Sequence, residues 1–115
     1  MFMTISIKDI EFKVKPVFTN KDIQHGMMNK KFNNSFDGML FFMNDGPHCF
    51  WMKSCVIDLD IIFIENNTIT KIHHTCKPCK KSPCENYCGN GDLILELEAG
   101  SCYRLGIQEG NKVVF

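Results

Sequence analysis

The residues best suited to chemistry in this chain are four cysteines in one short segment. They follow the pattern C-x2-C-x4-C-x3-C, with an inner pair, Cys79 and Cys84, and an outer pair, Cys76 and Cys88. Thiol groups this close together can bind a metal ion or oxidise to disulfides. The spacing disfavours an iron–sulfur cluster, because the bacterial ferredoxin pattern has a shorter middle gap. Zinc ribbons, in turn, separate their two cysteine pairs by a longer span.

Nested disulfides explain this pattern best. A bond within the inner pair, enclosed by a bond within the outer pair, would close short loops and stabilise the segment by about 2 to 4 kcal/mol. Zinc held by all four thiolates, or by three of them with His73 or His74, is the alternative. A thioredoxin-like redox site fits less well, because its C-x-x-C motif opens a helix after a strand. The other cysteines, Cys49, Cys55 and Cys102, lie among hydrophobic residues, where we expect them to be buried.

A second group of chemically capable residues lies at the centre of the chain. Trp51 and Lys53, followed by Asp58 and Asp60, combine an aromatic platform, a cation and two carboxylates. On one strand the two aspartates would point to the same face, about 7 Å apart. Alternatively, Trp51 is a core residue and Asp60 braces neighbouring backbone amides. The favoured interpretation is a ligand site beside these four residues, with the cysteine segment as its rim.

No complete catalytic motif accompanies these groups. Serine-nucleophile, phosphate-loop and H-E-x-x-H patterns are all missing. The leading hypothesis is therefore a non-catalytic binding module, without a cofactor, for a small polar ligand such as a carbohydrate or for a protein partner. The alternative is a zinc-binding or redox protein centred on the four cysteines, and a hydrolase that uses the two aspartates ranks third.

The hydrophobic pattern predicts the strands that must position these groups. Ile5 and Ile7 alternate with polar residues, and Phe12 and Val14 continue with the opposite parity, so a turn belongs at residues 8–9. Thr19 is a candidate N-cap for a short helix. Further along, residues 39–43 predict a strand that ends at an Asn-Asp-Gly-Pro turn, and residues 61–64 and 68–72 predict a hairpin.

Residues 73–91 are poor in hydrophobic side chains and are expected to form a long loop ordered by its cysteines. Residues 92–98 alternate again and predict a strand, with its leucines on one face and Glu96 and Glu98 on the other. A short helical turn is expected to end at Gly106, before a last strand over residues 113–115. About eight short strands and one or two short helices predict a mainly β fold, a sandwich or compact barrel, with residues 1–115 as a single domain.

Charge and hydropathy narrow the range of partners. Lys plus Arg and Asp plus Glu number 13 each, so no net field attracts nucleic acid. The apolar runs are far shorter than the roughly 20 residues that span a bilayer. No secretory signal is visible at the N-terminus, so the sequence as written predicts a cytoplasmic location.

Several motifs resemble those of one known family, DUF192, also called UPF0127, over roughly residues 12–115. The matching motifs are Thr19…Gly26-Met27-Met28, Gly38-Met39-Leu40-Phe41, Phe50-Trp51-Met52-Lys53, Leu59-Asp60-Ile61-Ile62-Phe63-Ile64, Pro78-Cys79…Pro83-Cys84…Tyr87, Leu95-Glu96-Leu97…Ala99-Gly100 and Leu105-Gly106-Ile107…Gly110. The resemblance implies a jelly-roll-like β-sandwich or barrel without an established biochemical activity, in a family whose members are often exported.

The resemblance also bears on the cysteines. Pro-Cys-x3-Pro-Cys recurs in relatives, whereas Cys76 and Cys88 are additions, and an outer pair added around an inner one favours disulfides over a four-thiolate metal site. The chain departs from the family pattern at Lys53-Ser54-Cys55, where relatives have Lys-Asn-Thr, and at Asp58-Leu59-Asp60, where they have Pro-Leu-Asp.

Overall fold

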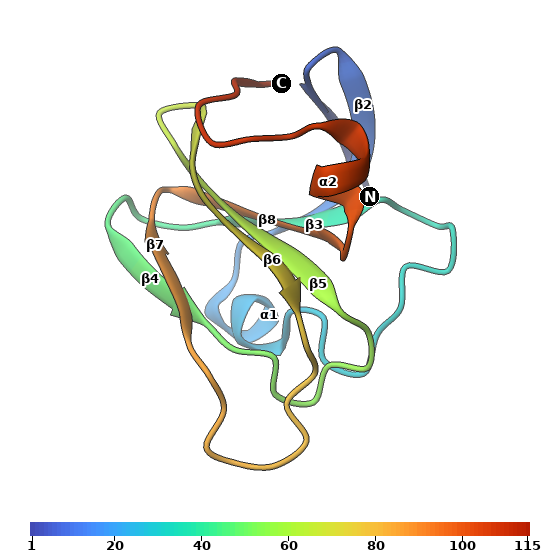
Figure 1. The fold of residues 1–115 in the computed structure, drawn as a ribbon, viewed down its shortest axis with the longest axis vertical. Helices are drawn as coiled ribbons and strands as arrows, with labels where there is room; N and C mark the ends of the chain where they lie inside the picture. The colour runs from blue at the N-terminus through green and yellow to red at the C-terminus, as the bar shows by residue number, and fades with distance from the viewer.

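Turns divide the chain into nine short strands and two short helices in the computed structural model, which describes all of residues 1–115 (Figure 1). The elements in chain order are β1 (Met3–Ile7), β2 (Ile10–Val17), α1 (Asn20–His25), β3 (Gly38–Phe42), β4 (Pro47–Phe50), β5 (Leu59–Glu65), β6 (Thr68–Cys76), β7 (Tyr87–Asn90), β8 (Leu93–Glu98), α2 (Ser101–Leu105) and β9 (Val113–Val114). The predicted mainly β fold class is confirmed.

Local sequence explains most of the element boundaries. Lys8 and Asp9 both take positive φ values, 55° and 64°, in the tight turn that reverses the chain between β1 and β2. At the start of α1, the Thr19 hydroxyl accepts a hydrogen bond of 3.1 Å from the Asp22 backbone N–H. Helix α2 ends at Gly106, whose φ of 69° is the left-handed conformation that glycine adopts without strain.

Seven strands form one curled sheet in the order β6-β5-β8-β3-β2-β1-β9. Strands β2 and β3 are parallel, and the other neighbours are antiparallel. The two ends of the sheet approach one another: the Ile69 N–H donates to the Asn111 carbonyl at 2.9 Å, and the Val113 N–H donates to the Asn67 carbonyl at 2.9 Å. The sheet therefore curls into a barrel-like body.

Side chains alternate across the sheet, and in the central strands β3, β5 and β8 the side chains on both faces are buried. One core cluster lies inside the curl and includes Leu40, Ile62 and Leu95. The other lies on the outer face and includes Phe41 and Phe63. Adjacent residues of β3 and β5 thus belong to different cores, and the outer core must be covered by the segments that leave the sheet.

A second, two-stranded sheet pairs β4 with β7. It lies against the outer core: a Cβ added at Gly89 would come 2.6 Å from the Phe63 ring, so this strand approaches the ring too closely for any side chain. The expected long loop over residues 73–91 is therefore wrong at both ends. Strand β6 continues to Cys76, and Tyr87–Asn90 pairs with β4, because pairing with distant strands orders sequence that lacks hydrophobic alternation. Only the segment between β6 and β7 is loop, at the end of the molecule far from both termini (Figure 1).

Candidate functional site

Two neighbouring hollows lie where the cysteine loop, the β4–β5 connection and α1 meet. The first, here called the basic groove, is about 920 Å³. The second, here called the apolar pocket, is about 250 Å³. Cys55 lines both, so the two hollows adjoin at its side chain.

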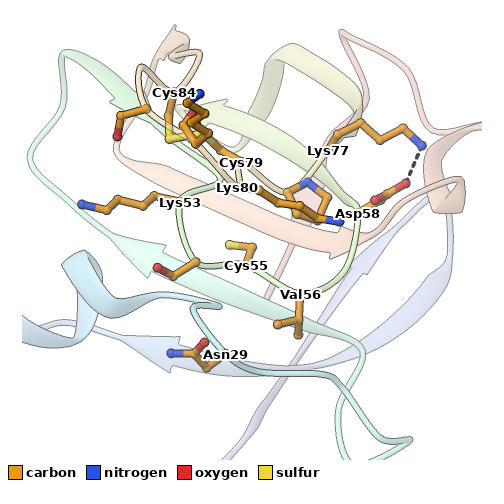
Figure 2. A pocket seen from close by; sticks show the side chains of 13 residues that line it. Asn29, Lys53, Cys55, Val56, Asp58, Lys77, Cys79, Lys80 and Cys84 are labelled. Carbon is orange, nitrogen blue, oxygen red and sulfur yellow. Dashed lines mark hydrogen bonds and ion pairs between the residues drawn. A yellow bond between two sulfur atoms is a disulfide. The ribbon is translucent and has the colours of Figure 1, made fainter.

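The basic groove brings Lys53 together with three lysines of the cysteine loop. Its lysines are Lys53, Lys77, Lys80 and Lys81. Its only acidic residue, Asp58, forms an ion pair with Lys77 at 2.7 Å, drawn as the dashed line in Figure 2. The disulfide between Cys79 and Cys84 lies on the rim of the same groove (Figure 2). The groove is polar, open and cationic, although the chain has no net charge.

The apolar pocket has a different character, because most of its walls are hydrophobic. Phe41 and Glu96 come from the sheet and form its floor, while α1 and the residues that follow it, including Met27, form one wall. Phe50 and Trp51 from the end of β4 form another. Trp51 is 43% exposed, so its indole ring lies at the mouth of the pocket rather than in the core.

Glu96 is the one acidic residue of this pocket, and its burial was not expected from the sequence. Glu96 shares a face of strand β8 with Ile94, a residue of the outer core, and residues of α1 and β4 cover this face beside Glu96. The Glu96 side chain is 4% exposed and makes no hydrogen bond to another protein group. The other buried acid, Asp60, accepts two. Burial alone raises the pKa of the Glu96 carboxyl to about 8.

Cys55 shares this environment. Burial, with a smaller contribution from the negative charge of Glu96, raises the pKa of its thiol to about 11. The thiol is therefore protonated and a poor nucleophile at neutral pH, and it contributes a weakly polar surface to both hollows.

The four residues expected to form one site are divided among three places. Lys53 and Asp58 line the basic groove, and Trp51 lines the apolar pocket, with the Lys53 ammonium 5.1 Å above the centre of its ring. Asp60 is fully buried, and its two carboxylate oxygens accept hydrogen bonds from the Thr75 N–H at 2.9 Å and the Cys102 N–H at 3.0 Å. The structure thus gives Asp60 the bracing role and keeps it away from the groove.

Comparison with known proteins places the chain in a family. The DUF192 family model, described as "Uncharacterized ACR", matches residues 3–115. The chain belongs to the DUF192 family. A comparison with curated proteins found no match.

Two solved structures share the fold of this DUF192 domain. A candidate transcription regulator from Sinorhizobium meliloti 1021 has a TM-score of 0.88 and 24% sequence identity, over 98% of this chain and 92% of that one. A protein of unknown function from Novosphingobium aromaticivorans DSM 12444 has a TM-score of 0.86 and 26% identity, over 99% of this chain and 85% of that one. The likeness establishes the fold and assigns no activity. No helix of this DUF192 domain is long and apolar enough to cross a bilayer.

The DUF192 domain has two disulfides, and only one of them is a pair predicted from the sequence. The inner bond, Cys79 to Cys84, is present. The predicted outer bond between Cys76 and Cys88 is wrong: Cys88 bonds to Cys49, which faces it across the β4–β7 ladder, and Cys76 is a buried free thiol. Cys49 is accordingly an exposed, bonded residue and not the buried thiol that its hydrophobic neighbours predicted.

The four cysteines of the alternative zinc site proposed from the sequence do not lie together as free thiols in this structure. Two of the four cysteines bond to each other, a third bonds to a partner outside the segment, and the fourth lies in the core. Sequence reasoning also missed the apolar pocket, whose lining comes from α1, β3, β4 and β8. The one available signal was a charged residue, Glu96, within an otherwise hydrophobic run over residues 93–97.

Proposed function

We propose that this DUF192 domain is a non-catalytic binding module that holds a small molecule in the apolar pocket. The ligand has an apolar body and a cationic or hydrogen-bond-donating head that lies against Glu96. The observation that carries the proposal is a buried carboxyl group, without a protein partner, in the wall of an accessible apolar pocket. Such a group is costly to bury unless a hydrogen bond compensates it, and a ligand can supply that bond.

The pocket walls define the body of the ligand. Aromatic rings from β3 and β4 and methionines after α1 offer hydrophobic contact, with Glu96 as the single orienting carboxyl. A volume of about 250 Å³ suits a molecule of modest size. A carbohydrate fits this pocket less well than the sequence suggested, because its many hydroxyls would meet mostly apolar walls.

The ionisation of Glu96 makes the expected affinity depend on pH. With a pKa of about 8, the carboxyl is mostly protonated at neutral pH. A primary ammonium group binds the ionised form, so the apparent affinity for an amine should fall about tenfold for each pH unit below 8. An alcohol of the same length bonds to the neutral acid and should show a much smaller pH dependence.

Trp51 provides the readout, because it is the only tryptophan and lies at the pocket mouth. Its fluorescence would be titrated at pH 8 with n-hexylamine, n-hexanol, n-hexanoate and glucose. We expect saturable binding of hexylamine, weaker binding of hexanol and none of hexanoate, which would place a second negative charge beside Glu96. Glu96→Gln should weaken hexylamine binding by about 10- to 100-fold, since a charge-assisted hydrogen bond is lost.

Glu98→Gln is the matched control, because Glu98 lies on the same strand but is exposed. It should bind hexylamine as the unmodified protein does. Equal affinity of the Glu96→Gln variant, or stronger binding of glucose or hexanoate than of hexylamine, would contradict the proposal.

A further inference from the structure

A separate cluster of potential metal ligands lies beneath α2. Asp60 from β5, His74 from β6 and Cys102 from α2 each direct one donor atom to the same place, and these atoms all lie within 4.8 Å of one another. The three residues are far apart in the sequence, so they meet only because β5 pairs with β6 and α2 packs on that hairpin. None of them lines the basic groove or the apolar pocket.

His74 has a buried ring nitrogen that no protein group satisfies. Its Nδ1 atom is buried and has no hydrogen-bond partner. The imidazole ring is held in place by Tyr103, which stacks on it with ring centres 4.1 Å apart and planes inclined by 18°. An imidazole nitrogen that is buried without a partner is uncommon in folded proteins and needs a physical explanation.

Asp60 and Cys102 bring potential negative charge to the same point. Asp60 is 0% exposed and Cys102 is 1% exposed, and Cys102 forms no disulfide. Each Asp60 oxygen accepts one backbone N–H, which leaves a lone pair on each. These lone pairs and the Cys102 sulfur are free to bind a cation.

We propose that Asp60, His74 and Cys102 form a zinc-binding site. The donor set of one sulfur, one nitrogen and one carboxylate oxygen suits Zn²⁺, whereas Mg²⁺ and Ca²⁺ select oxygen ligands. Zinc holds such donors at about 2.0 to 2.3 Å, so the three side chains need to draw together only slightly. On binding, the Cys102 thiol releases its proton to solvent and the sulfur coordinates as thiolate.

The surroundings leave room for a fourth ligand. A cavity of about 430 Å³ borders the cluster and is lined by His74, Cys102 and Tyr103. Three protein ligands with an adjoining cavity correspond to an open zinc site, in which water or a small anion completes the coordination. The cavity also provides the route by which an ion reaches otherwise buried ligands.

Cobalt substitution tests the site, because Co²⁺ occupies zinc sites and bound thiolate gives it a charge-transfer absorption band. The protein would be prepared with both disulfides formed, verified by intact mass, and titrated with Co²⁺ and then with Zn²⁺. We expect one Co²⁺ per chain, a thiolate band, and loss of that band when Zn²⁺ displaces the cobalt. Zn²⁺ should also raise the melting temperature, since it binds only the folded state.

Matched variants identify the ligands. Cys102→Ser should abolish the thiolate band, whereas Cys76→Ser, which alters an equally buried free thiol, should keep it. His74→Gln should weaken Co²⁺ binding more than tenfold, whereas His73→Gln should not, because His73 bonds to the Cys88 carbonyl instead. Asp60 is left unchanged, since its loss would release two backbone amides and disturb the fold. The proposal is overturned if the oxidised protein binds neither metal, or if the band survives in Cys102→Ser or disappears in Cys76→Ser.

Discussion

The two most deeply buried acidic residues of the curled sheet, Asp60 and Glu96, differ in the hydrogen bonds that their carboxyl groups accept. Asp60 accepts two backbone N–H groups, which compensate the loss of water around its carboxylate. Glu96 has no such donors, and its carboxyl faces a mostly apolar pocket. An ionised carboxyl group in this position destabilises the folded state. A ligand that offsets this cost would therefore be bound with a favourable free energy.

The titration of Glu96 leads to a prediction about stability. Its carboxyl titrates near 4.5 in the unfolded chain and near 8 in the folded protein. Between these values the folded state holds a proton that the unfolded chain has lost. The free energy of unfolding should therefore decrease as pH rises, by up to about 1.4 kcal/mol per pH unit, with the loss complete above about pH 8. Urea unfolding at several pH values, compared between the unmodified protein and Glu96→Gln, measures this contribution.

The Glu96→Gln variant should lack this decrease, because glutamine does not titrate. Glu98→Gln should retain it, since Glu98 is exposed. Parallel pH dependences for the unmodified protein and Glu96→Gln would show that Glu96 ionises normally.

At the scale of elements, the small β4–β7 sheet depends on covalent and close-packed contacts. Each of its strands has four residues, and an isolated two-stranded sheet is marginally stable in water. A disulfide between the facing residues Cys49 and Cys88 holds the strands together, and Gly89 allows them to lie on the Phe63 ring. Because Cys49, Phe50 and Trp51 line the apolar pocket, this disulfide also fixes one of its walls.

The two disulfides should contribute unequally to stability. The sequence separation is 39 residues for Cys49–Cys88 and 5 residues for Cys79–Cys84. Restriction of the unfolded chain by loops of these lengths corresponds to about 4 and about 2 kcal/mol, respectively. In urea unfolding, a Cys49→Ser, Cys88→Ser double variant should therefore lose more than a Cys79→Ser, Cys84→Ser double variant. The opposite order would mean that the bonds act mainly through strain or contacts in the folded state.

At the scale of the molecule, the inner and outer cores are built from the same strands. Ile62 and Phe63 are neighbours on β5, yet Ile62 packs inside the curl and Phe63 packs on the outer face. A strand cannot lose one set of contacts while it keeps the other in place. The two cores therefore belong to one folding unit, as the single domain expected from the chain length also requires.

This arrangement predicts one cooperative unfolding transition. Ile62→Ala should destabilise the protein by about 2 to 5 kcal/mol, the usual cost of such a core truncation. The loss should appear equally in Trp51 fluorescence, which reports the outer side, and in far-UV circular dichroism, which reports the whole sheet. Val114→Ala alters an exposed side chain and should leave both transitions where they were. Separate midpoints for the two signals would contradict a single unit.

Much of the fold followed from local sequence, because turns, caps and alternation depend on residues close together in the chain. The turn at Lys8 and Asp9, the Thr19 cap and the end of α2 at Gly106 all form as predicted. The inner disulfide, Cys79 to Cys84, belongs to the same class, since its partners are five residues apart.

The sites, in contrast, depend on contacts between distant segments. Glu96 is buried only because residues of α1 and β4 cover the outer face of β8, and Cys88 bonds to Cys49 only because β7 pairs with β4. The amino-acid sequence alone determined the family, the mainly β class and most of the strands, because alternation is a local property. The tertiary structure decided which acids are buried and which cysteines meet, because strand order and register bring together residues that no local pattern connects.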